Sequence, residues 1–336
     1  MRACLLAWLG LAASLLGSPV MAQTALGQQE ALQWLQRVAG AAQTLSYSGT
    51  FVYRNGSQSE TSRVVHVVSA GNLQEKLEVL DGSPREIIRR NDEVRCYLPE
   101  SRLVIIEQRS ARRAFPALLP ASLAGLGEHY VIRQGARARI AGYDGQIIRL
   151  EPRDAWRYGR QFWVERKSGL LLKAELFDER GEVLESLAFT ELRIGEPASP
   201  DALKSTFADI ANAKEPWQVR QSKTRDLRDD AQWLFRVELP GFRRQAAMRR
   251  GIEQSAGKDA QEVLHWVYSD GLAAVSVFIN PLSPQAEPVV QSDPSVRSLG
   301  AISVVKRVIQ GQQIVVMGDV PPAAVKRFIE GIEVRK

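Results

Sequence analysis

Short segments of alternating polar and apolar residues, separated by turn sequences, restrict the fold of this chain more than any other feature. The segment LSYSGTFVY, which starts at Leu45, runs into Arg54-Asn55-Gly56, and SRVVHVVSAGN follows it. An Asn-Gly pair between two alternating segments is a strong hairpin signal. Four more segments of this kind occupy residues 73–109, divided by Asp-Gly, Asn-Asp and Pro-Glu-Ser turn sequences. Residues 45–109 therefore predict a large antiparallel meander of six short strands.

A second run of strand-like segments covers residues 130–194. Between the two runs, residues 115–130 are apolar but follow neither a strand nor a long helical period, and Pro120 predicts the first turn of a short helix. Before the first run, apolar residues recur at helical spacing over residues 26–42. One antiparallel sheet of about ten strands has to curl strongly, and side-chain alternation gives it an apolar concave face.

The strand pattern stops over residues 195–230, which contain three prolines and many charges. A weak helix near residues 203–211, followed by an exposed linker, is the simplest interpretation. Beyond the linker, further strand-like segments and a helix that Pro321 and Pro322 open form a smaller unit. We expect an α+β fold with a large, strongly curved antiparallel sheet and a smaller α+β C-terminal domain. The expected divisions are a signal peptide at 1–22, a first domain at 23–213, a linker at 214–231 and a second domain at 232–336.

The N-terminus has the features of an export signal. It combines one Arg, an apolar run over residues 3–16, a Gly-Ser-Pro break and Val20-Met21-Ala22 before Gln23. This pattern is typical of a secretory signal peptide that is cleaved after Ala22. No later window approaches ~20 uninterrupted apolar residues, so we do not expect the mature protein to span a membrane. Only Cys96 remains after cleavage, which excludes an internal disulfide and leaves the state of this thiol open.

Composition predicts a folded, basic protein. Hydrophobic residues make up 45% of the chain, charged residues 24%, and the mean hydropathy is −0.19. The formal net charge of +6 is carried mostly by Arg, which binds carboxylates and phosphates through paired hydrogen bonds and so suits acidic peptides or anionic lipid headgroups. An ordinary solvated surface is the alternative. Nucleic acid is not an expected partner, because the charge is scattered along the chain.

The stretch HWVYSDGLAAVSVFI, residues 265–279, holds His, Ser and Asp close together and is the candidate for nucleophilic catalysis. Strand alternation places His265 and Ser269 on one side of a strand, and Asp270-Gly271 supplies a hairpin turn. We expect Asp270 at a solvated tip, where it cannot orient His265, whereas a catalytic triad needs contacts from distant segments. No H-x-x-x-H, C-x-x-C, G-x-S-x-G or Gly-rich phosphate loop is present. We therefore expect no enzyme, no metal and no cofactor.

Binding is the remaining class of function. Apolar side chains of the first helix, the curved sheet and residues 115–126 are candidates for an acyl-chain cavity, with the last segment as its lid. The alternative is that the same side chains fill an ordinary core. The lipid-cavity candidates are Trp34, Leu35, Phe51, Phe115, Leu118, Leu119, Leu123 and Trp163. Separately, the Arg-rich residues 238–251 are either a patch for an acidic partner or a solvated loop.

Five segments carry a family resemblance, namely SGTFVYRNG (48–56), PRDAWRYG (152–159), SGLLLKAELFDERGEVLESLAFTEL (168–192), YSDGLAAVSVFI (268–279) and VVMGDVPPAAVKRFIEGI (315–332). In this order they resemble the MucB/RseB family of periplasmic regulators. The resemblance runs from about Trp34 to the C-terminal helix, and the part before residue 214 is similar to the LolA-like lipoprotein-carrier architecture, an unclosed barrel plugged by helices. One departure is VELPGF, which is one residue shorter than the family's Trp-Leu-Pro-x-Gly-Phe pattern.

The resemblance implies a non-enzymatic, periplasmic negative regulator of the sigma-E type envelope stress response. Such a protein binds the periplasmic part of a single-pass membrane anti-sigma factor of the RseA/MucA type and protects it from proteolysis. Lipid or lipopolysaccharide fragments that enter the carrier-like domain release it. The resemblance places the main anti-sigma contact in the second domain. The candidates for this contact are Arg243, Arg244, Arg249, Arg250, Tyr268 and Phe278.

Two other functions compete with this one. A periplasmic lipid or lipoprotein carrier is the alternative, although a carrier has no need of residues 232–336. A periplasmic hydrolase is third, with only the His, Ser and Asp of residues 265–270 in its favour. The sequence leaves open the identity of the lipid signal and the oligomeric state.

Overall fold

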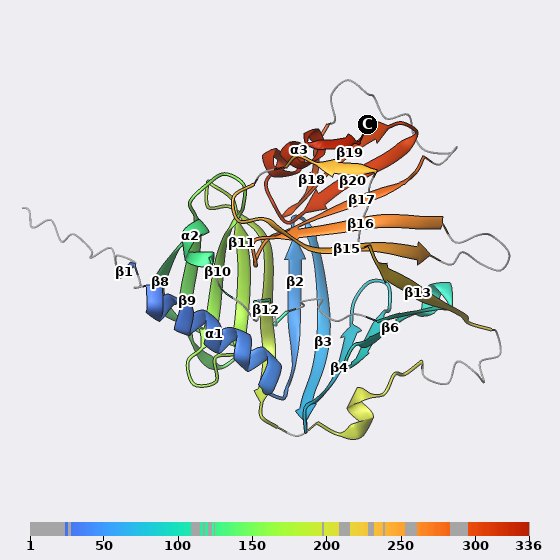
Figure 1. Ribbon diagram of the computed structural model, residues 1–336. Coiled ribbons are helices and arrows are strands. Elements are labelled where there is room, and N and C mark those ends of the chain that lie inside the picture. Colours follow the sequence, from blue (N-terminus) through green and yellow to red (C-terminus); the bar gives the residue numbers. More distant parts are fainter. Residues whose placement is uncertain are drawn as a thin grey trace, which may run out of the picture.

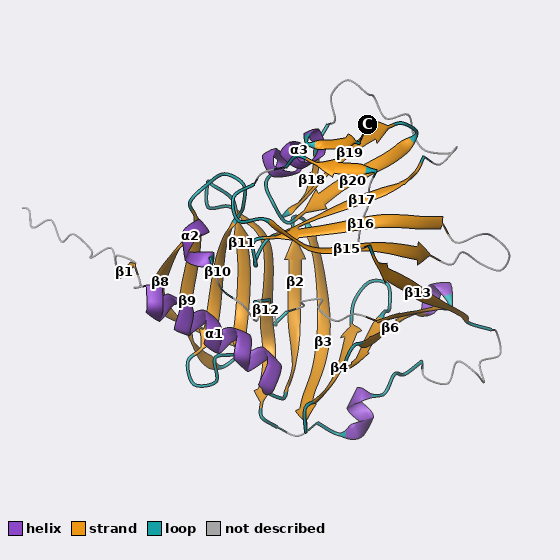
Figure 2. Ribbon diagram, viewed as in Figure 1, coloured by secondary structure: helices purple, strands orange, loops and turns teal. Residues whose placement is uncertain are grey.

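The computed structural model describes residues 24–25, 28–108, 115–116, 118–119, 123, 125–196, 198–207, 216–227, 232–237, 239–252, 261–282 and 295–335. Strands make up most of it, with few helices (Figure 2). The expected signal peptide, residues 1–22, lies outside the described residues. No helix in the described part has both the length and the apolar character needed to cross a bilayer.

Twelve strands form the large sheet, here called the N-terminal sheet. Its strands lie in the order β1–β8–β9–β10–β11–β12–β2–β3–β4–β5–β6–β7. All of these pairs are antiparallel, and β12 returns the chain to β2. The strands are β1 (Thr24–Ala25), β2 (Tyr47–Asn55), β3 (Gln58–Ser69), β4 (Asn72–Val79), β5 (Glu86–Arg90), β6 (Glu93–Leu98), β7 (Leu103–Gln108), β8 (Tyr130–Ile140), β9 (Tyr143–Pro152), β10 (Gly159–Glu165), β11 (Leu171–Phe177) and β12 (Val183–Ile194).

The six-strand meander expected over residues 45–109 is confirmed, since β2 to β7 follow one another in space as in sequence. The turn at Asn55-Gly56 joins β2 to β3, with Gly56 at a φ of 58°. Register shifts in the β8–β9, β10–β11 and β12–β2 pairs add local twist. The sheet is strongly curved and not closed into a barrel, which confirms the expected fold class (Figure 1).

Helix α1 (Gln28–Thr44) confirms the expected first helix and lies across the N-terminal sheet (Figure 1). Its Leu35 and Val38 are almost fully buried in the same apolar cluster as the sheet. A short α2 (Leu126–His129) leads into β8. The expected helix near residues 203–211 is wrong for its described part, because the chain forms only a 3₁₀ turn, Pro200–Leu203, and bends through residues 204–207. The helical turn expected at Pro120 lies outside the described residues.

The C-terminal sheet has the strand order β15–β16–β17–β20–β19–β18 and carries helix α3 (Pro322–Glu330) on one face (Figure 1). Helix α3 confirms the expected C-terminal helix, and its Val325, Phe328 and Ile329 are buried. The strands are β15 (Arg243–Ile252), β16 (Gln261–Ser269), β17 (Ala274–Pro281), β18 (Arg297–Leu299), β19 (Ile302–Ile309) and β20 (Gln312–Gly318), with β14 (Trp233–Phe235) and β21 (Ile332–Val334) paired beside them.

Strand β13 (Gln218–Asp226) joins the two sheets. Its first half, residues 218–222, pairs in parallel with β7, and its second half, residues 223–226, pairs antiparallel with β15. Nine residues of the expected linker 214–231 thus form a strand, most of whose residues are exposed. The expected domain boundaries stay a prediction.

The residues that leave the N-terminal sheet are held on its β4–β5 face by a buried carboxylate. Glu86 accepts hydrogen bonds from the Ser205 hydroxyl at 2.5 Å and the Thr206 hydroxyl at 2.6 Å, and Lys76 Nζ lies 3.0 Å away. Burial alone would raise the pKa of Glu86, but these hydrogen bonds outweigh it and hold the pKa below its ordinary value. The ionised carboxylate is thus the form that the fold stabilises.

We expect Glu86→Gln to lower the free energy of unfolding by about 2 kcal/mol at neutral pH, because three charge-assisted contacts lose their charge. A group with a lowered pKa stabilises the fold above its unfolded-state pKa, and this contribution is lost as the pH falls through the lower folded-state value. Urea unfolding should therefore show the difference from wild type shrinking as the pH falls below 4.5, the ordinary pKa of Glu, and through the lower folded-state value. Glu78→Gln, on an exposed 3.5 Å pair with Arg63, is the control and should change little.

Candidate binding surfaces and the domain interface

The lipid-cavity candidates are brought together by the fold. Six of the eight, namely Leu35, Phe51, Phe115, Leu119, Leu123 and Trp163, belong to one buried apolar cluster, and Trp34 and Leu118 pack against it. We call this set and its neighbours the N-terminal cluster. Trp163 differs from the others, because alternation along β10 turns its side chain to the face opposite that of Phe162. On the Trp163 face, Lys173 Nζ lies 4.4 Å from the centroid of the indole ring.

Phe115 fills the centre of the N-terminal cluster. Its ring centroid lies 5.3 Å from that of Phe51 and 4.9 Å from that of Phe189, and 6% of the residue is exposed. The expected lid side chain is therefore packed between two sheet aromatics. Phe115 therefore bears on both interpretations of these residues, as core and as cavity. An acyl chain that entered the cluster would have to displace it.

A cleft of about 890 Å³ opens at one end of the N-terminal sheet, at the β8–β9 and β10–β11 turns. Tyr143 and Ile194 line it and also pack against the N-terminal cluster, so the apolar interior continues into the cleft. Arg139, Arg166 and Lys167 supply three positive charges at its rim, against the two carboxylates of Asp144 and Glu165. The Glu165 carboxylate accepts the backbone N–H of Lys167 at 3.0 Å and so faces its own turn. An apolar wall beside a basic rim suits a molecule with a hydrocarbon part and an anionic head.

The expected partner-binding residues do not form one patch. Residues 243–251 are part of strand β15, so the alternative of a solvated loop is wrong for them. The β15–β16 register places Arg244 and Arg249 on the α3 side of the sheet, and Arg243 and Arg250 on the other side. Arg249 forms an exposed 2.8 Å pair with Glu262.

The two aromatic candidates are also on opposite sides of the C-terminal sheet. Tyr268 packs against Phe328 of α3, with ring centroids 5.2 Å apart. Phe278 faces away from α3 and stacks on His265, with centroids 4.2 Å apart and planes at 15°. The side of the sheet that Phe278 faces carries a row of residues that pair in register across β15, β16, β17, β20 and β19. The row, called the Phe278 face, is Met248, His265, Phe278, Val315 and Lys306.

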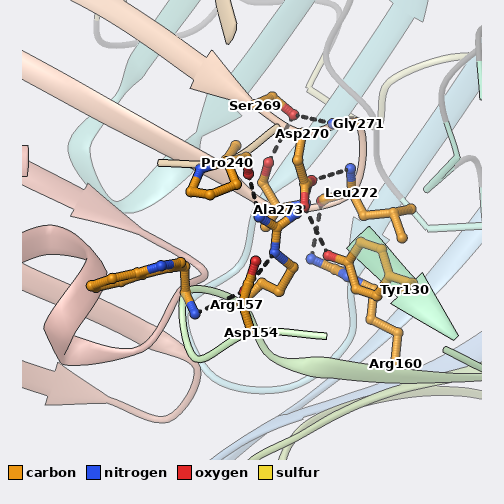
Figure 3. A network of polar contacts seen from close by, with 12 residues as sticks. Tyr130, Asp154, Arg157, Arg160, Pro240, Ser269, Asp270, Gly271, Leu272 and Ala273 are labelled. Atoms are coloured by element: carbon orange, nitrogen blue, oxygen red, sulfur yellow. Dashed lines mark hydrogen bonds and ion pairs between the residues drawn. The ribbon is translucent and has the colours of Figure 1, made fainter. Parts of the chain in front are cut away.

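A network of polar contacts lies between the two sheets (Figure 3). Arg157 donates to Asp270 Oδ2 at 2.7 Å and to Asp154 Oδ1 at 3.0 Å, and it also donates to the carbonyl of Pro240. The side chains of both Arg157 and Asp270 are 0% exposed. A buried Arg with three oxygen partners has its charge compensated and its fork of N–H groups satisfied.

A second ion pair lies beside the first. Arg160 of β10 contacts Asp319 Oδ2 at 2.6 Å and donates to the carbonyl of Leu272 at 3.0 Å. Asp319 Oδ1 accepts the N–H of Ala274 at 2.7 Å. Burial raises the pKa of the Asp319 carboxyl, although the Arg160 guanidinium opposes this. Arg160 thereby holds the end of β20 and the start of β17 against the N-terminal sheet.

Tyr130 connects this polar site to the N-terminal cluster. Its ring belongs to the cluster, with 1% of the residue exposed, and its hydroxyl donates to Asp270 Oδ2 at 2.9 Å. Burial, and then the charge of Asp270, raise the pKa of the Tyr130 hydroxyl. The hydroxyl is therefore protonated and acts as the donor of this hydrogen bond.

The solvated turn expected at Asp270 is wrong. Its Oδ1 accepts the N–H groups of Leu272 and Ala273, both at 2.8 Å, while Oδ2 faces Arg157 and Tyr130. The expectation that residues 265–270 form no triad agrees with the geometry. Ser269 Oγ donates to the Ala273 carbonyl, and His265 Nε2 lies 3.1 Å from Ser276 Oγ. Among the described residues there is no group of His, Cys, Asp and Glu arranged to hold a metal ion.

Sequence reasoning missed Tyr130, Arg157, Arg160 and Asp319. A signal was present, because Arg157 lies in PRDAWRYG and Asp270 in YSDGLAAVSVFI, two of the segments that carry the family resemblance. These two segments face each other across the interface.

Family models match almost all of the described chain. The model of the MucB/RseB N-terminal domain matches residues 30–207, and that of the MucB/RseB C-terminal domain matches residues 228–333. The sigma factor AlgU regulatory protein MucB of Pseudomonas aeruginosa is 32% identical over 321 residues, 93% of each chain. The sigma-E factor regulatory protein RseB of Escherichia coli K12 is 26% identical over 301 residues, 89% of each chain.

Solved structures share the fold over the same length. A crystal structure of MucB in complex with MucA(peri) has a TM-score of 0.67 and 27% identity, covering 91% of this chain and 99% of that one. The complex structure of Pseudomonas aeruginosa MucA/MucB has a TM-score of 0.68 and 28% identity, with the same coverage of both chains.

The buried pair at the interface makes a direct prediction about stability. Arg157→Met should lower the free energy of unfolding by about 3 kcal/mol, because it leaves the Asp270 carboxylate buried without its cation. Arg180→Met is the control, since Arg180 forms ion pairs with Asp178 and Glu182 but its side chain is 70% exposed. Urea unfolding followed by Trp fluorescence measures both. Equal, small losses for the two variants would contradict the assigned role of Arg157.

Proposed function

Because the chain belongs to the MucB/RseB family, as its sequence motifs predict, we propose that it is a periplasmic negative regulator of a sigma-E type envelope stress response. It binds the periplasmic part of a membrane anti-sigma factor and shields that segment from proteolysis. The observation that carries this proposal is the match over 91% of the chain to MucB structures solved with MucA. The apparent export signal at residues 1–22 supports a periplasmic location.

The Phe278 face is the docking surface that we assign to the anti-sigma segment. It combines the half-buried apolar side chains of Met248, Phe278 and Val315 with the positive charge of Lys306, and Arg250 lies on the same side of β15. The opposite face of the same sheet is already covered by α3. An aromatic side chain amid apolar neighbours, with Arg at the margin, has the composition of a protein-binding hot spot.

The signal that releases the partner is a lipid or a lipopolysaccharide fragment. The N-terminal cluster would take the acyl part and the cleft beside it the anionic head. The apolar continuity through Tyr143 and Ile194 and the basic rim support this assignment. A periplasmic lipid or lipoprotein carrier remains the second candidate function, since the same cleft and cluster would serve it; the C-terminal sheet, tied to the N-terminal one through buried ion pairs, favours the regulator.

We expect Phe278→Ala to weaken binding of the mature protein to the anti-sigma periplasmic segment at least about tenfold, as for a hot-spot aromatic. Leu299→Ala is the matched control, because Leu299 is an apolar residue of the same sheet that is 57% exposed and lies outside the Phe278 face. Titration calorimetry measures both, with thermal melts to check folding. A pull-down from membrane extract that recovers no single-pass membrane partner would overturn the regulator proposal itself.

The Arg166→Ala, Lys167→Ala double variant should weaken binding of lipopolysaccharide by about fivefold at low salt, with a smaller effect at high salt, because exposed charges are screened. Arg225→Ala, Arg249→Ala is a control of equal charge change on β13 and β15, away from the cleft. Fluorescent lipopolysaccharide displacement measures the affinities. If both double variants weaken binding equally, the net charge of the protein and not the cleft attracts the lipid.

A further inference from the structure

The tip of the β16–β17 hairpin, residues 270–273, belongs to the C-terminal sheet but lies inside the N-terminal part of the protein. The Asp270 side chain is fully buried between Arg157 and Tyr130. Leu272, which is 8% exposed, is a member of the N-terminal cluster together with Phe115, Leu119 and Leu123. The C-terminal sheet therefore contributes one side chain to the apolar cluster of the N-terminal part.

This tip is rigid because it is hydrogen-bonded within itself. Asp270 Oδ1 accepts two backbone N–H groups, and Ser269 Oγ both accepts from Gly271 N at 2.9 Å and donates to the Ala273 carbonyl at 2.7 Å. Gly271 has a φ of 105°, which favours glycine. A displacement of the tip is therefore passed to β16 and β17 as a whole rather than absorbed in the turn.

The same two strands carry the surface that we assign to the partner. His265 lies on β16 and Phe278 on β17, and Phe278 pairs with Val315 on β20. On the other side of the tip lies the N-terminal cluster. The lid residues Phe115, Leu119 and Leu123 belong to this cluster together with Tyr130 and Leu272. The tip thus lies between the cluster that holds the lid residues and the two strands that carry the Phe278 face.

We propose that the hairpin tip 270–273 is the element through which occupancy of the N-terminal cluster changes partner affinity, with Tyr130 and Leu272 as the positioning residues that contact it from the cluster. This proposal rests on the proposed function. An acyl chain that displaces Phe115 changes the packing around Tyr130 and Leu272. The tip then moves relative to Arg157, and β16 and β17 move with it. Ligand and partner are coupled because each prefers a different position of one rigid element.

The test measures the affinity for the anti-sigma segment with and without saturating lipopolysaccharide, and the ratio of the two affinities is the coupling factor. We expect about tenfold weakening by lipopolysaccharide in the wild type. Tyr130→Phe removes only the hydroxyl that reaches Asp270 and should reduce the coupling factor to about twofold or less. Because the factor is a ratio, a change in the basal affinity of a variant cancels. Reciprocity requires that the partner weaken lipopolysaccharide binding by the same factor in each protein.

Tyr97→Phe is the matched control. Tyr97 is also almost fully buried, but it packs with Ile88 and Val104 in a separate apolar cluster of the N-terminal sheet, so this variant should keep the wild-type coupling factor. Leu272→Ala is a second test from the other side of the contact and should also reduce coupling, with thermal melts to show that it folds. A wild-type coupling factor in both Tyr130→Phe and Leu272→Ala overturns the role of the tip while leaving the proposed function intact. A wild type without any coupling overturns the release mechanism and this inference together.

Discussion

The buried ion pair between Arg157 and Asp270 determines how the two sheets of this protein sit on each other. Taking a carboxylate and a guanidinium out of water is costly unless each finds several partners. Here each does: the guanidinium contacts Asp154 and the Pro240 carbonyl, and the carboxylate accepts from Tyr130 and from the backbone of its own turn. The partners come from both sheets, so the charges are satisfied in one arrangement of the two parts. Charge satisfaction therefore favours that arrangement.

The local features of the fold were predictable from sequence because they depend on neighbours in the chain. Alternation and the Asn55-Gly56 turn indicated β2 and β3, and helical spacing indicated α1 and α3. Strand β13 was not predictable, because most of its residues are exposed and its sequence QVRQSKTRD has no apolar alternation. It becomes a strand by pairing with β7 and β15, which are distant in sequence.

In the candidate sites, too, the features that depend on local pattern were predictable and those that depend on distant residues were not. Apolar residues such as Phe51 and Phe115 were placed together correctly, because hydrophobic side chains in a curled sheet and its covering segment have one interior to share. The environment of Asp270 was predicted wrongly. An Asp-Gly pair indicates a turn, but a turn is exposed or buried according to what lies opposite it, and the residue opposite is Arg157, 113 positions away in the chain. The side of the sheet that each Arg of β15 faces could also be assigned only from the strand register, which places Arg249 and Arg250 on opposite sides.

Strand β13 has a consequence for how this protein can be divided. The first matched family region ends at residue 207 and the second begins at residue 228. A fragment limited to either region therefore lacks β13. Such a fragment would expose the backbone N–H and C=O groups of β7 or of β15 that β13 now pairs with. An uncovered strand edge is a template for pairing with another chain. Each half produced alone would therefore tend to associate with itself through an edge that the intact protein never presents, and its oligomeric state would report on the cut and not on the native protein.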